Sequence, residues 1–483
     1  MIILQLLKQL STRERTKFQE YVSAPFFNKN EKIKQLCQIL LAYAPAFNPD
    51  LINKERIYQQ IYLSPKYQEL KLNNLISDLL QLLYDYLSYL QYEKQNIHQK
   101  SLLLSALQDR NLRQHMPRQA KRYRQIQQKS PFRSHQYFWD EYRLYEELDR
   151  LSLSSGKRGY DKNLQLKSEM LDMYYCCNKL SIACDMTSRN IVVNAGYECN
   201  FLTEILAQFQ ANERLQQQPT LQIYYKTLEM LQQEDETKHY FQLKELLGQH
   251  WQLFPSNELR ILYHYALNYG VKKINSGQVE FYQEILELYK ILLSKKIIFK
   301  DGYLTQWTYI NIVTAGIRLE DYKWTENFIN EYRESLHPSN QHNVYIYNLA
   351  ALYYAQRDYK RALQLLHDVE FTDAFYHLSA KIIQLKSYYD LEEIEAFLSL
   401  AEATRIYITR NRQLSDYQKR SNANFLKLAT RLLQIRLRAP ILPAKEISRQ
   451  VQQLQQQLES KTVANKGWLL EAYQQLDLPH LKE

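Results

Sequence analysis

The sequence predicts an all-α protein, and three observations support this. Its 483 residues include only 9 glycines and 12 prolines, well below the roughly 7% and 5% of average proteins, so few turns need a positive φ or a fixed bend. Leu, Gln, Lys, Glu and Arg dominate the composition, and these residues lose little side-chain freedom in a helix. Apolar residues recur at the 3.6-residue helical period along most of the chain.

Capping signals mark the first helices. Ser11 and Glu14 have the spacing of a capping box, in which a hydroxyl meets a free helix amide and a carboxylate reaches back. This helix should end before Pro25, because proline disfavours helix in the residue before it. Residues 28–31 (Asn-Lys-Asn-Glu) open a second helix, which Pro45 should end.

A third, longer helix should begin at Ser64 and Pro65, with the serine as N-cap and the proline in the first helical position. Its apolar pattern continues to about residue 90. The same periodicity predicts helices over 116–129, 133–151, 164–189 and 221–233.

Two loops are candidate boundaries along the chain. The segment 152–162 is rich in Ser and Gly, and the segment 216–219 is Gln-Gln-Gln-Pro. Neither is long enough for a disordered linker, so we expect a continuous stack of helices. We divide it into an N-terminal helical region at 1–110, a middle region at 111–235 and a repeat region at 236–483.

One stretch of the third region has the spacing of a helix-turn-helix repeat. Its first helix has an apolar stripe at i, i+3, i+4 and i+7, formed by Ile346, Leu349, Ala350 and Tyr353. Arg357 and Asp358 make the turn, and the second helix places Ala362 and Leu366 four residues apart. The small side chains of Ala350 and Ala362 allow the two helices to approach closely.

This unit resembles a tetratricopeptide repeat. Leu349, Tyr353 and Ala362 match that family's pattern, whereas Ile346, Ala350 and Leu366 stand in for its Trp, Gly and Phe. The family's proline is missing, because Ala374 occupies that position. The preceding unit, 309–330, aligns with a period of 37 but has Gly316 where the family has Tyr and Thr325 where it has Ala.

The N-terminal third, with Ser-Ala-Pro-Phe-Phe-Asn at 23–28, resembles an uncharacterised family of bacterial helical proteins. This resemblance implies a bacterial origin and no particular function.

The repeat resemblance implies an α-solenoid of stacked antiparallel helix pairs, tetratricopeptide-like in the C-terminal half. Each pair then buries its apolar faces only against its neighbours, which leaves a long concave groove. The residues that face this groove would be Tyr347, Ala351 and Tyr354, at i, i+4 and i+7. Tyrosine suits a binding surface because it buries a large area with few rotatable bonds. We therefore expect a protein-interaction scaffold with an unidentified protein partner, although packing against the next repeat explains these tyrosines equally well.

The net charge of +10 is concentrated in two segments. Residues 110–133 contain eight basic side chains and no acidic one, and residues 405–449 contain eleven basic and two acidic. In the second segment four cations form a stripe about 40° wide and about 27 Å long, namely Arg420, Lys427, Arg431 and Arg438. In the first, Arg118, Arg122 and Lys129 share a helix face.

Such rows of cations favour an anionic partner, because each contact with a phosphate releases counterions. A nucleic-acid-binding solenoid is therefore the alternative function, next to an acidic peptide or a simple solvated helix face. The sequence has neither a zinc-finger spacing nor a ribonucleoprotein aromatic motif, so no recognised nucleic-acid-binding module supports this alternative.

The sequence gives no reason to expect an enzyme. It lacks the phosphate-binding loop, the dinucleotide-binding, the zinc-protease and the nucleophile-elbow patterns. The five cysteines have no metal-site spacing, so we expect no metal, no cofactor and no small-molecule substrate. The N-terminus has no secretory-leader pattern and no apolar run is long enough to span a bilayer, so we expect a cytoplasmic protein.

Overall fold

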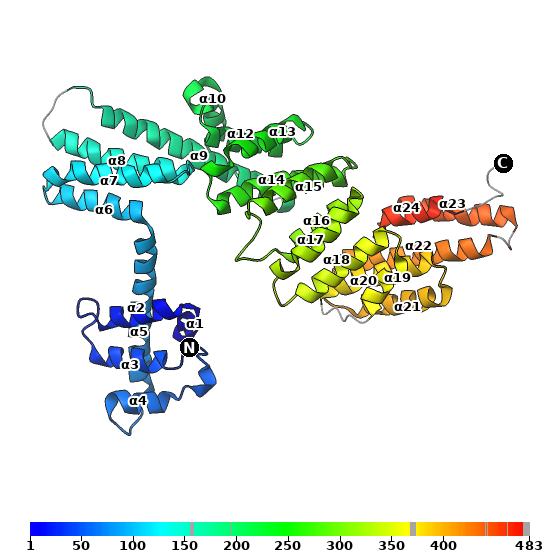
Figure 1. Ribbon diagram of the computed structural model, residues 1–483, viewed down its shortest axis with the longest axis horizontal. Coiled ribbons are helices and arrows are strands. Elements are labelled where there is room, and N and C mark those ends of the chain that lie inside the picture. Colours follow the sequence, from blue (N-terminus) through cyan, green and yellow to red (C-terminus); the bar gives the residue numbers. More distant parts are fainter. Residues whose placement is uncertain are drawn as a thin grey trace. The chain divides into compact units, whose positions relative to one another are not determined.

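The computed structural model describes residues 1–154, 159–193, 195–367, 373–439, 441, 443–460 and 462–476. Within these ranges the chain forms 24 α-helices and four short 3-10 helices, and no β-strand (Figure 1). Consecutive helices pack against each other as pairs. The predicted all-α solenoid of stacked helix pairs is therefore confirmed.

The chain folds as two compact units. The first consists of Met1–Leu228 with Leu246–Pro255, and the second of Glu229–Glu245 with Ser256–Glu483. The division passes through two helices, α12 (Pro219–Gln232) and α13 (Lys238–His250). The division of the stack into three regions stays a prediction.

The other α-helices of the first unit are α1 (Ile2–Gln9), α2 (Thr12–Ser23), α3 (Glu31–Leu41), α4 (Lys54–Tyr62), α5 (Glu69–Lys94), α6 (Asn96–Asp109), α7 (Met116–Lys129), α8 (His135–Ser154), α9 (Lys162–Val193), α10 (Leu202–Ala211) and α11 (Glu213–Gln216). Those of the second unit are α14 (Ser256–Asn275), α15 (Phe281–Ser294), α16 (Gln306–Arg318), α17 (Tyr322–Glu331), α18 (Gln341–Ala355), α19 (Tyr359–His367), α20 (Ala374–Asp390), α21 (Ile394–Arg410), α22 (Asp416–Arg438), α23 (Ala444–Ser460) and α24 (Lys466–Gln474).

The first helices begin and end where the capping signals predict. The Glu14 amide donates to the Ser11 hydroxyl at 3.3 Å, and the Ser11 amide donates to the Glu14 carboxylate at 2.8 Å. The Ser11 hydroxyl also donates to the Glu14 carboxylate at 2.7 Å, and this bond, together with the one from the Ser11 amide, holds the pKa of Glu14 below its usual value. Helix α5 is tied to this turn, since the buried Tyr86 donates its hydroxyl to the Glu14 carbonyl at 2.9 Å. The core of α1–α5 is built around such contacts.

The predicted start of α5 at Ser64 and Pro65 is wrong. The helix begins at Glu69, and residues 63–68 connect it to α4. Leu63 ends α4 in a left-handed conformation with a φ of 49°, and the Tyr67 ring packs edge-on against Tyr58 at 5.6 Å. A Ser-Pro pair is also a turn signal, and here the packing of Tyr67 favours the turn.

The predicted helices of the middle region are confirmed as α7, α8, α9 and α12. The candidate boundary at 152–162 falls partly on residues 155–158, which lie outside the described residues. Helix α7 is amphipathic, and its inner face buries Met116, Ala120, Tyr123 and Gln127. The Tyr123 hydroxyl donates to the Asp140 carbonyl of α8 at 2.6 Å.

The predicted helix-turn-helix unit is formed by α18 and α19. The turn falls at residues 356–358, where Arg357 has a positive φ of 63°. Ala350 and Ala362 are both completely buried, as expected for two small residues at a close helix crossing.

The two departures from the repeat pattern in the preceding unit lie against each other. Gly316 is in α16, and Thr325 is in α17. A Cβ atom on Gly316 would lie 2.1 Å from the Thr325 hydroxyl oxygen. That oxygen is held in place, since it donates to the Asp321 carbonyl at 2.7 Å. The glycine is therefore what allows the threonine to fit between the helices.

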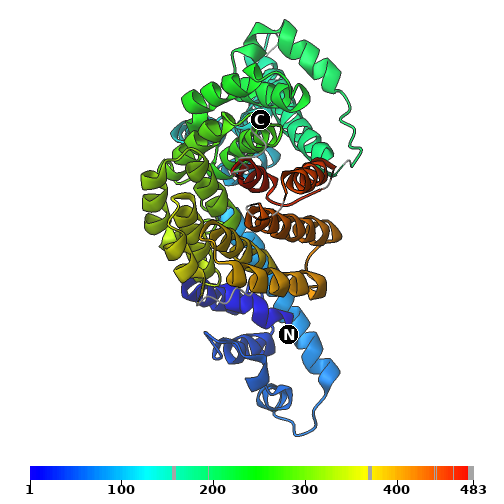
Figure 2. The same ribbon diagram turned by 90° about the vertical axis from the view of Figure 1, so that its right-hand side faces the viewer.

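The last helices of the second unit share one core. Phe425 of α22 and Tyr389 of α20 both contact Trp468 of α24, with ring centroids 5.7 and 5.2 Å apart. In Figure 2 the helices of this unit follow a curve from α14 (green) to α22 (brown), and α24 (dark red) lies on its inner side. Within the described ranges no helix combines the length and the apolar character that a membrane-spanning segment requires.

Candidate functional site

The concave side of the second unit contains a cavity of about 730 Å³. Residues from α16, α18, α20 and α24 line it. The three predicted groove residues, Tyr347, Ala351 and Tyr354, all lie on its α18 wall. The spacing i, i+4 and i+7 thus places them on one face, and that face is open to the cavity.

Two polar contacts cross this cavity between different helices. Tyr354 of α18 donates its hydroxyl to the Asp390 carboxylate of α20 at 2.9 Å. The Lys386 ammonium of α20 donates to the Asn465 side-chain oxygen, next to α24, at 2.7 Å, and lies 5.7 Å from the centre of the Trp468 ring. These contacts fix the walls of the cavity relative to each other.

The cavity shifts the pKa of the groups that it contains. Burial lowers the pKa of Lys386 to about 8, and the like charge of Arg318 adds to this effect. Lys386 is half-buried and lies in the lining of the cavity. Burial raises the pKa of Asp390, although the Tyr354 hydroxyl stabilises its charged form. Groups with shifted pKa values in a concave site are typical of binding and catalytic centres.

The sequence predicts the cavity residues of α18 but not those of the other helices that line the cavity. Lys386 and Asp390 are four residues apart on α20, so their common face was readable, but nothing local shows that it meets α18. Trp468 is far along the chain and reaches the cavity only because α24 folds back onto α20 and α22. Tyr347 also packs on Tyr376 of α20, with ring centroids 5.4 Å apart, so it has both a packing role and an open face.

A second, basic groove of about 1250 Å³ lies along α21, α22 and α23. Three of the four residues of the predicted C-terminal stripe line it, namely Lys427, Arg431 and Arg438. Arg420 is exposed but does not line the groove. The neighbouring helices add three cations, Arg405, Lys445 and Arg449, and two acids, Glu402 and Glu446.

Only part of this charge is neutralised. Arg405 forms a two-pronged pair with Glu402, at 2.9 and 2.6 Å. Arg431 donates to the Gln453 side-chain oxygen at 2.6 Å. In the described part of the chain Lys427 and Arg438 form no ion pair. The groove is therefore suited to an anion that follows its length.

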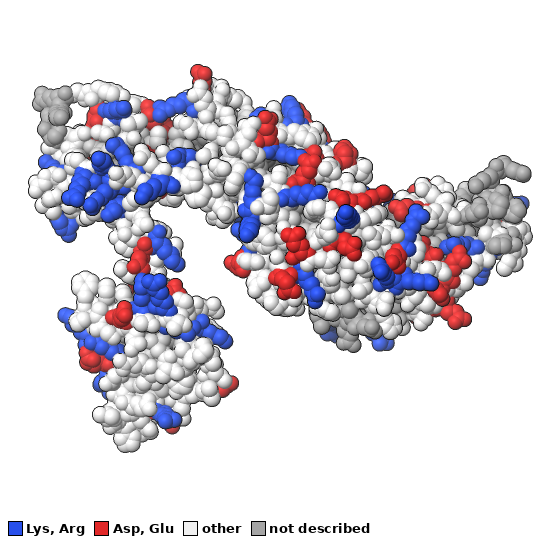
Figure 3. Space-filling view, in the orientation of Figure 1, with Lys and Arg blue, Asp and Glu red and all other residues white. Residues whose placement is uncertain are grey.

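A third basic surface is the outer face of α7. Arg118, Arg122 and Lys129 are all exposed and lie opposite the buried face of the helix, as predicted. Lys121 is exposed beside them, and none of the four forms an ion pair among the residues that the structure describes. Figure 3 shows Lys and Arg side chains gathered over α7, at the left of the view.

Comparison of the chain with protein-family models, with curated proteins and with solved structures finds no match.

Proposed function

We propose that this protein is a non-enzymatic helical-repeat scaffold that binds a segment of a partner protein in the concave cavity of its second unit. The observation that carries the proposal is the common wall formed by Tyr347, Ala351 and Tyr354, which faces helices from three other pairs. The resemblance of α18–α19 to a tetratricopeptide repeat supports it, because concave surfaces of such stacks are extended binding surfaces. We place this activity in the cytoplasm.

The size and lining of the cavity suit a short peptide segment. Its volume of about 730 Å³ is in the range of sites that enclose a ligand of a few side chains. Aromatic rings and the aliphatic Ile382 and Ile383 offer apolar area, while Arg318, Lys386 and Glu471 offer charges of both signs. A partner segment with apolar anchors and mixed charge would satisfy this surface.

The test is a substitution that fills the cavity without removing a contact. Ala351 is half-buried on the cavity wall, so Ala351→Arg should block it while α18 stays folded. Ala403 on α21 is an exposed alanine outside the cavity, and Ala403→Arg is the matched control. The tagged full-length protein is used to capture partners from its native lysate after nuclease treatment.

We expect Ala351→Arg to lose a defined protein partner that the wild type and Ala403→Arg both retain. Circular dichroism must show equal helix content in all three proteins. A partner that is retained by Ala351→Arg would exclude the cavity as its binding site.

The alternative function is binding of nucleic acid by the basic faces. The observation that favours it is that several cations on α7 and in the α21–α23 groove, Lys427 and Arg438 among them, form no ion pair within the described part of the chain. On this hypothesis the affinity falls steeply with salt. A plot of log K against log salt concentration then has a slope of about −0.9 for each phosphate contact with duplex DNA. Charge reversal of Arg118, Arg122 and Lys129 to Glu would then reduce the slope by about 2 to 3.

The matched control reverses three exposed cations elsewhere in the first unit, Arg13, Lys29 and Lys66. Charge reversal of Arg420, Lys427, Arg431 and Arg438 to Glu is tested in the same way, by its effect on the salt dependence of the affinity. Binding that does not depend on salt, or that both triple variants weaken equally, would contradict a site on α7.

A further inference from the structure

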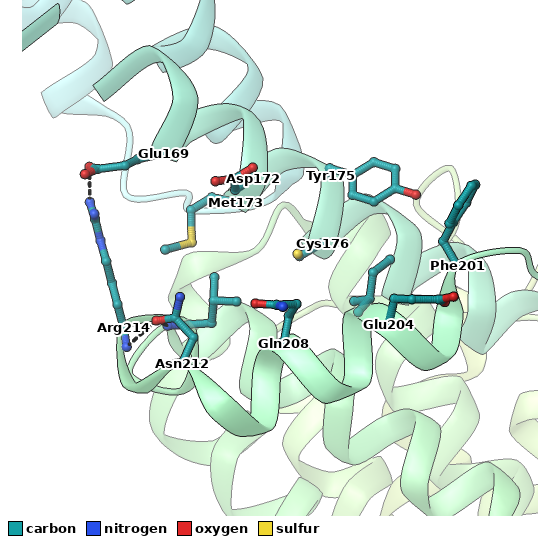
Figure 4. A pocket seen from close by; sticks show the side chains of 12 residues that line it. Glu169, Asp172, Met173, Tyr175, Cys176, Phe201, Glu204, Gln208, Asn212 and Arg214 are labelled. Atoms are coloured by element: carbon teal, nitrogen blue, oxygen red, sulfur yellow. Dashed lines mark hydrogen bonds and ion pairs between the residues drawn. The ribbon is translucent and has the colours of Figure 1, made fainter. Parts of the chain in front are cut away.

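The first unit contains a separate pocket of about 380 Å³ between α9 and α10–α11 (Figure 4). Its floor is apolar, because Met173 and Cys176 of α9 face Ile205 of α10 and Leu215 of α11, and all four are buried. Burial raises the pKa of the Cys176 thiol, so the thiol is neutral and adds no charge to this floor. The volume is in the range of small-ligand sites.

Two helix faces with the same kind of pattern form the pocket. On α9, Glu169, Asp172, Met173 and Cys176 are spaced i, i+3, i+4 and i+7. On the other side, Glu204, Ile205 and Gln208 share a face of α10, and Phe201 precedes this helix as its N-cap. Each face therefore places carboxylates next to apolar residues, and the carboxylates stand around the rim while the apolar side chains form the floor.

The two ends of the pocket differ. At one end Arg214 closes it through an ion pair with Glu169, with nitrogen and oxygen 2.5 Å apart, as Figure 4 shows. At the other end stand the rings of Tyr175 and Phe201, which are 43% and 64% exposed. A pocket bounded in this way accepts a compact molecule or a single side chain, and not an extended helix.

The rim carries more negative than positive charge. Arg214 neutralises Glu169, but neither Asp172 nor Glu204 has an ion-pair partner among the described residues. Both are exposed at the rim. Partial burial and the nearby charge of Glu169 raise the pKa of Asp172, as expected for a carboxylate that lacks a cation.

We propose that this pocket binds an organic cation in which an ammonium or guanidinium group is carried on an aromatic or aliphatic body. The apolar body occupies the floor between Met173 and Ile205, where it is removed from water. The cationic group lies at the rim beside Glu204, next to the exposed faces of Tyr175 and Phe201, which attract cations. Asp172 adds to the negative charge of the same rim. The cation is carried either by a free amine or by a Lys or Arg side chain of a polypeptide.

The test uses the full-length protein and two ligands with the same ring. Tryptamine carries an ammonium group, and indole-3-propionate carries a carboxylate in its place. Titration calorimetry and ligand-observed NMR should show saturable binding of tryptamine. Indole-3-propionate should bind at least about tenfold more weakly, because its charge repels the rim. A blocked dipeptide, acetyl-Trp-Arg-amide, is the third ligand, and whichever of it and tryptamine binds more tightly identifies the source of the cation.

Two variants locate the binding. Asp172→Asn with Glu204→Gln keeps the size of both side chains and should weaken tryptamine by about fivefold or more, since the charge contact at Glu204 and the negative charge of Asp172 at the rim are both lost. The matched control, Glu55→Gln with Asp78→Asn, removes two exposed carboxylates of α4 and α5 and should bind as the wild type. Gln208→Trp places a ring in the pocket from an exposed position and should abolish binding.

The proposal is overturned if none of the ligands binds with saturation, or if tryptamine and indole-3-propionate bind equally well. It is also overturned if the Asp172→Asn and Glu204→Gln variant binds tryptamine as tightly as the control variant does.

Discussion

Substitution of Gly316 by alanine should destabilise the protein, although alanine is the better helix former. Its Cβ atom would lie 2.1 Å from the Thr325 hydroxyl oxygen and 3.3 Å from the Thr325 Cβ. Thr325 is completely buried, and turning its hydroxyl away would break the 2.7 Å hydrogen bond to Asp321. Overpacking of this kind costs about 1–3 kcal/mol, against a gain of about 0.5–1 kcal/mol from helix propensity. The net loss should be about 1–2 kcal/mol.

The effect of Gly316→Ala on stability should change sign when Thr325 is replaced by alanine. In a Thr325→Ala background the clashing oxygen is absent and only the contact with Cβ remains. Gly316→Ala should then be neutral or stabilising by up to about 1 kcal/mol. The two substitutions are therefore coupled, as expected for residues in contact.

The assay is urea unfolding of the full-length chain, followed by circular dichroism, with hydrogen exchange over α16–α19 to localise the effect. The m-values of the variants must agree for the midpoints to be compared. Gly248 in α13 has nothing within 4 Å of an added Cβ, so Gly248→Ala is the matched control and should not destabilise. If Gly316→Ala lowers the free energy of unfolding equally with threonine and with alanine at position 325, the clash with the Thr325 hydroxyl is refuted as the cause.

Three further predictions concern buried polar groups. Asn28→Ala should lower the free energy of unfolding by about 1–3 kcal/mol in the same assay. The reason is that the Asn28 side chain donates to the Val22 carbonyl and accepts from the Asn30 amide, each at 2.9 Å. A loss below about 0.5 kcal/mol, as at ordinary surface sites, would contradict this. Arg150→Met should lower the free energy of unfolding by about 1–3 kcal/mol, because it leaves the buried Glu147 without its ion pair. Adding Glu147→Gln should restore part of this stability. If no stability is recovered, the ion pair is unimportant. Because the pKa of Lys386 in the folded state, about 8, lies below its ordinary 10.5, the unfolded chain binds more protons between these values and the contribution of Lys386 to stability rises with pH there. The stability of the wild type relative to Lys386→Met should accordingly rise between pH 8 and pH 10.5, and a constant difference would refute the shift.

Local signals in the sequence predicted most of the helices. The capping box at Ser11 and Glu14 is complete within four residues, so no distant contact was needed to interpret it. Ser64 and Pro65 failed because the same pair is compatible with a helix start and with a turn, and Tyr67 packing on Tyr58 decides between them. Helix starts are thus predictable where the partner of the signal is itself local.

The candidate sites were predictable only one helix face at a time. The spacing of Tyr347, Ala351 and Tyr354 shows that they share a face, but not that α24 stands opposite. The stripe on α22 was correctly aligned, yet the position of α23 decides which of its cations line the groove, and this excludes Arg420. The pocket between α9 and α10 gave no signal, because alternating acidic and apolar residues are also typical of an ordinary solvated helix face.

The placement of α24 on the wall of the concave cavity links ligand binding to the docking of the C-terminal helix. A ligand that contacts both Lys386 and Trp468 binds only the docked arrangement, so it stabilises that arrangement by RT ln(1 + [L]/Kd). A protease that cleaves the chain between α23 and α24 would then act more slowly as the cavity fills. The cleavage rate of the protein's own C-terminal segment thus becomes a label-free readout of cavity occupancy, one that is usable before any ligand has been identified.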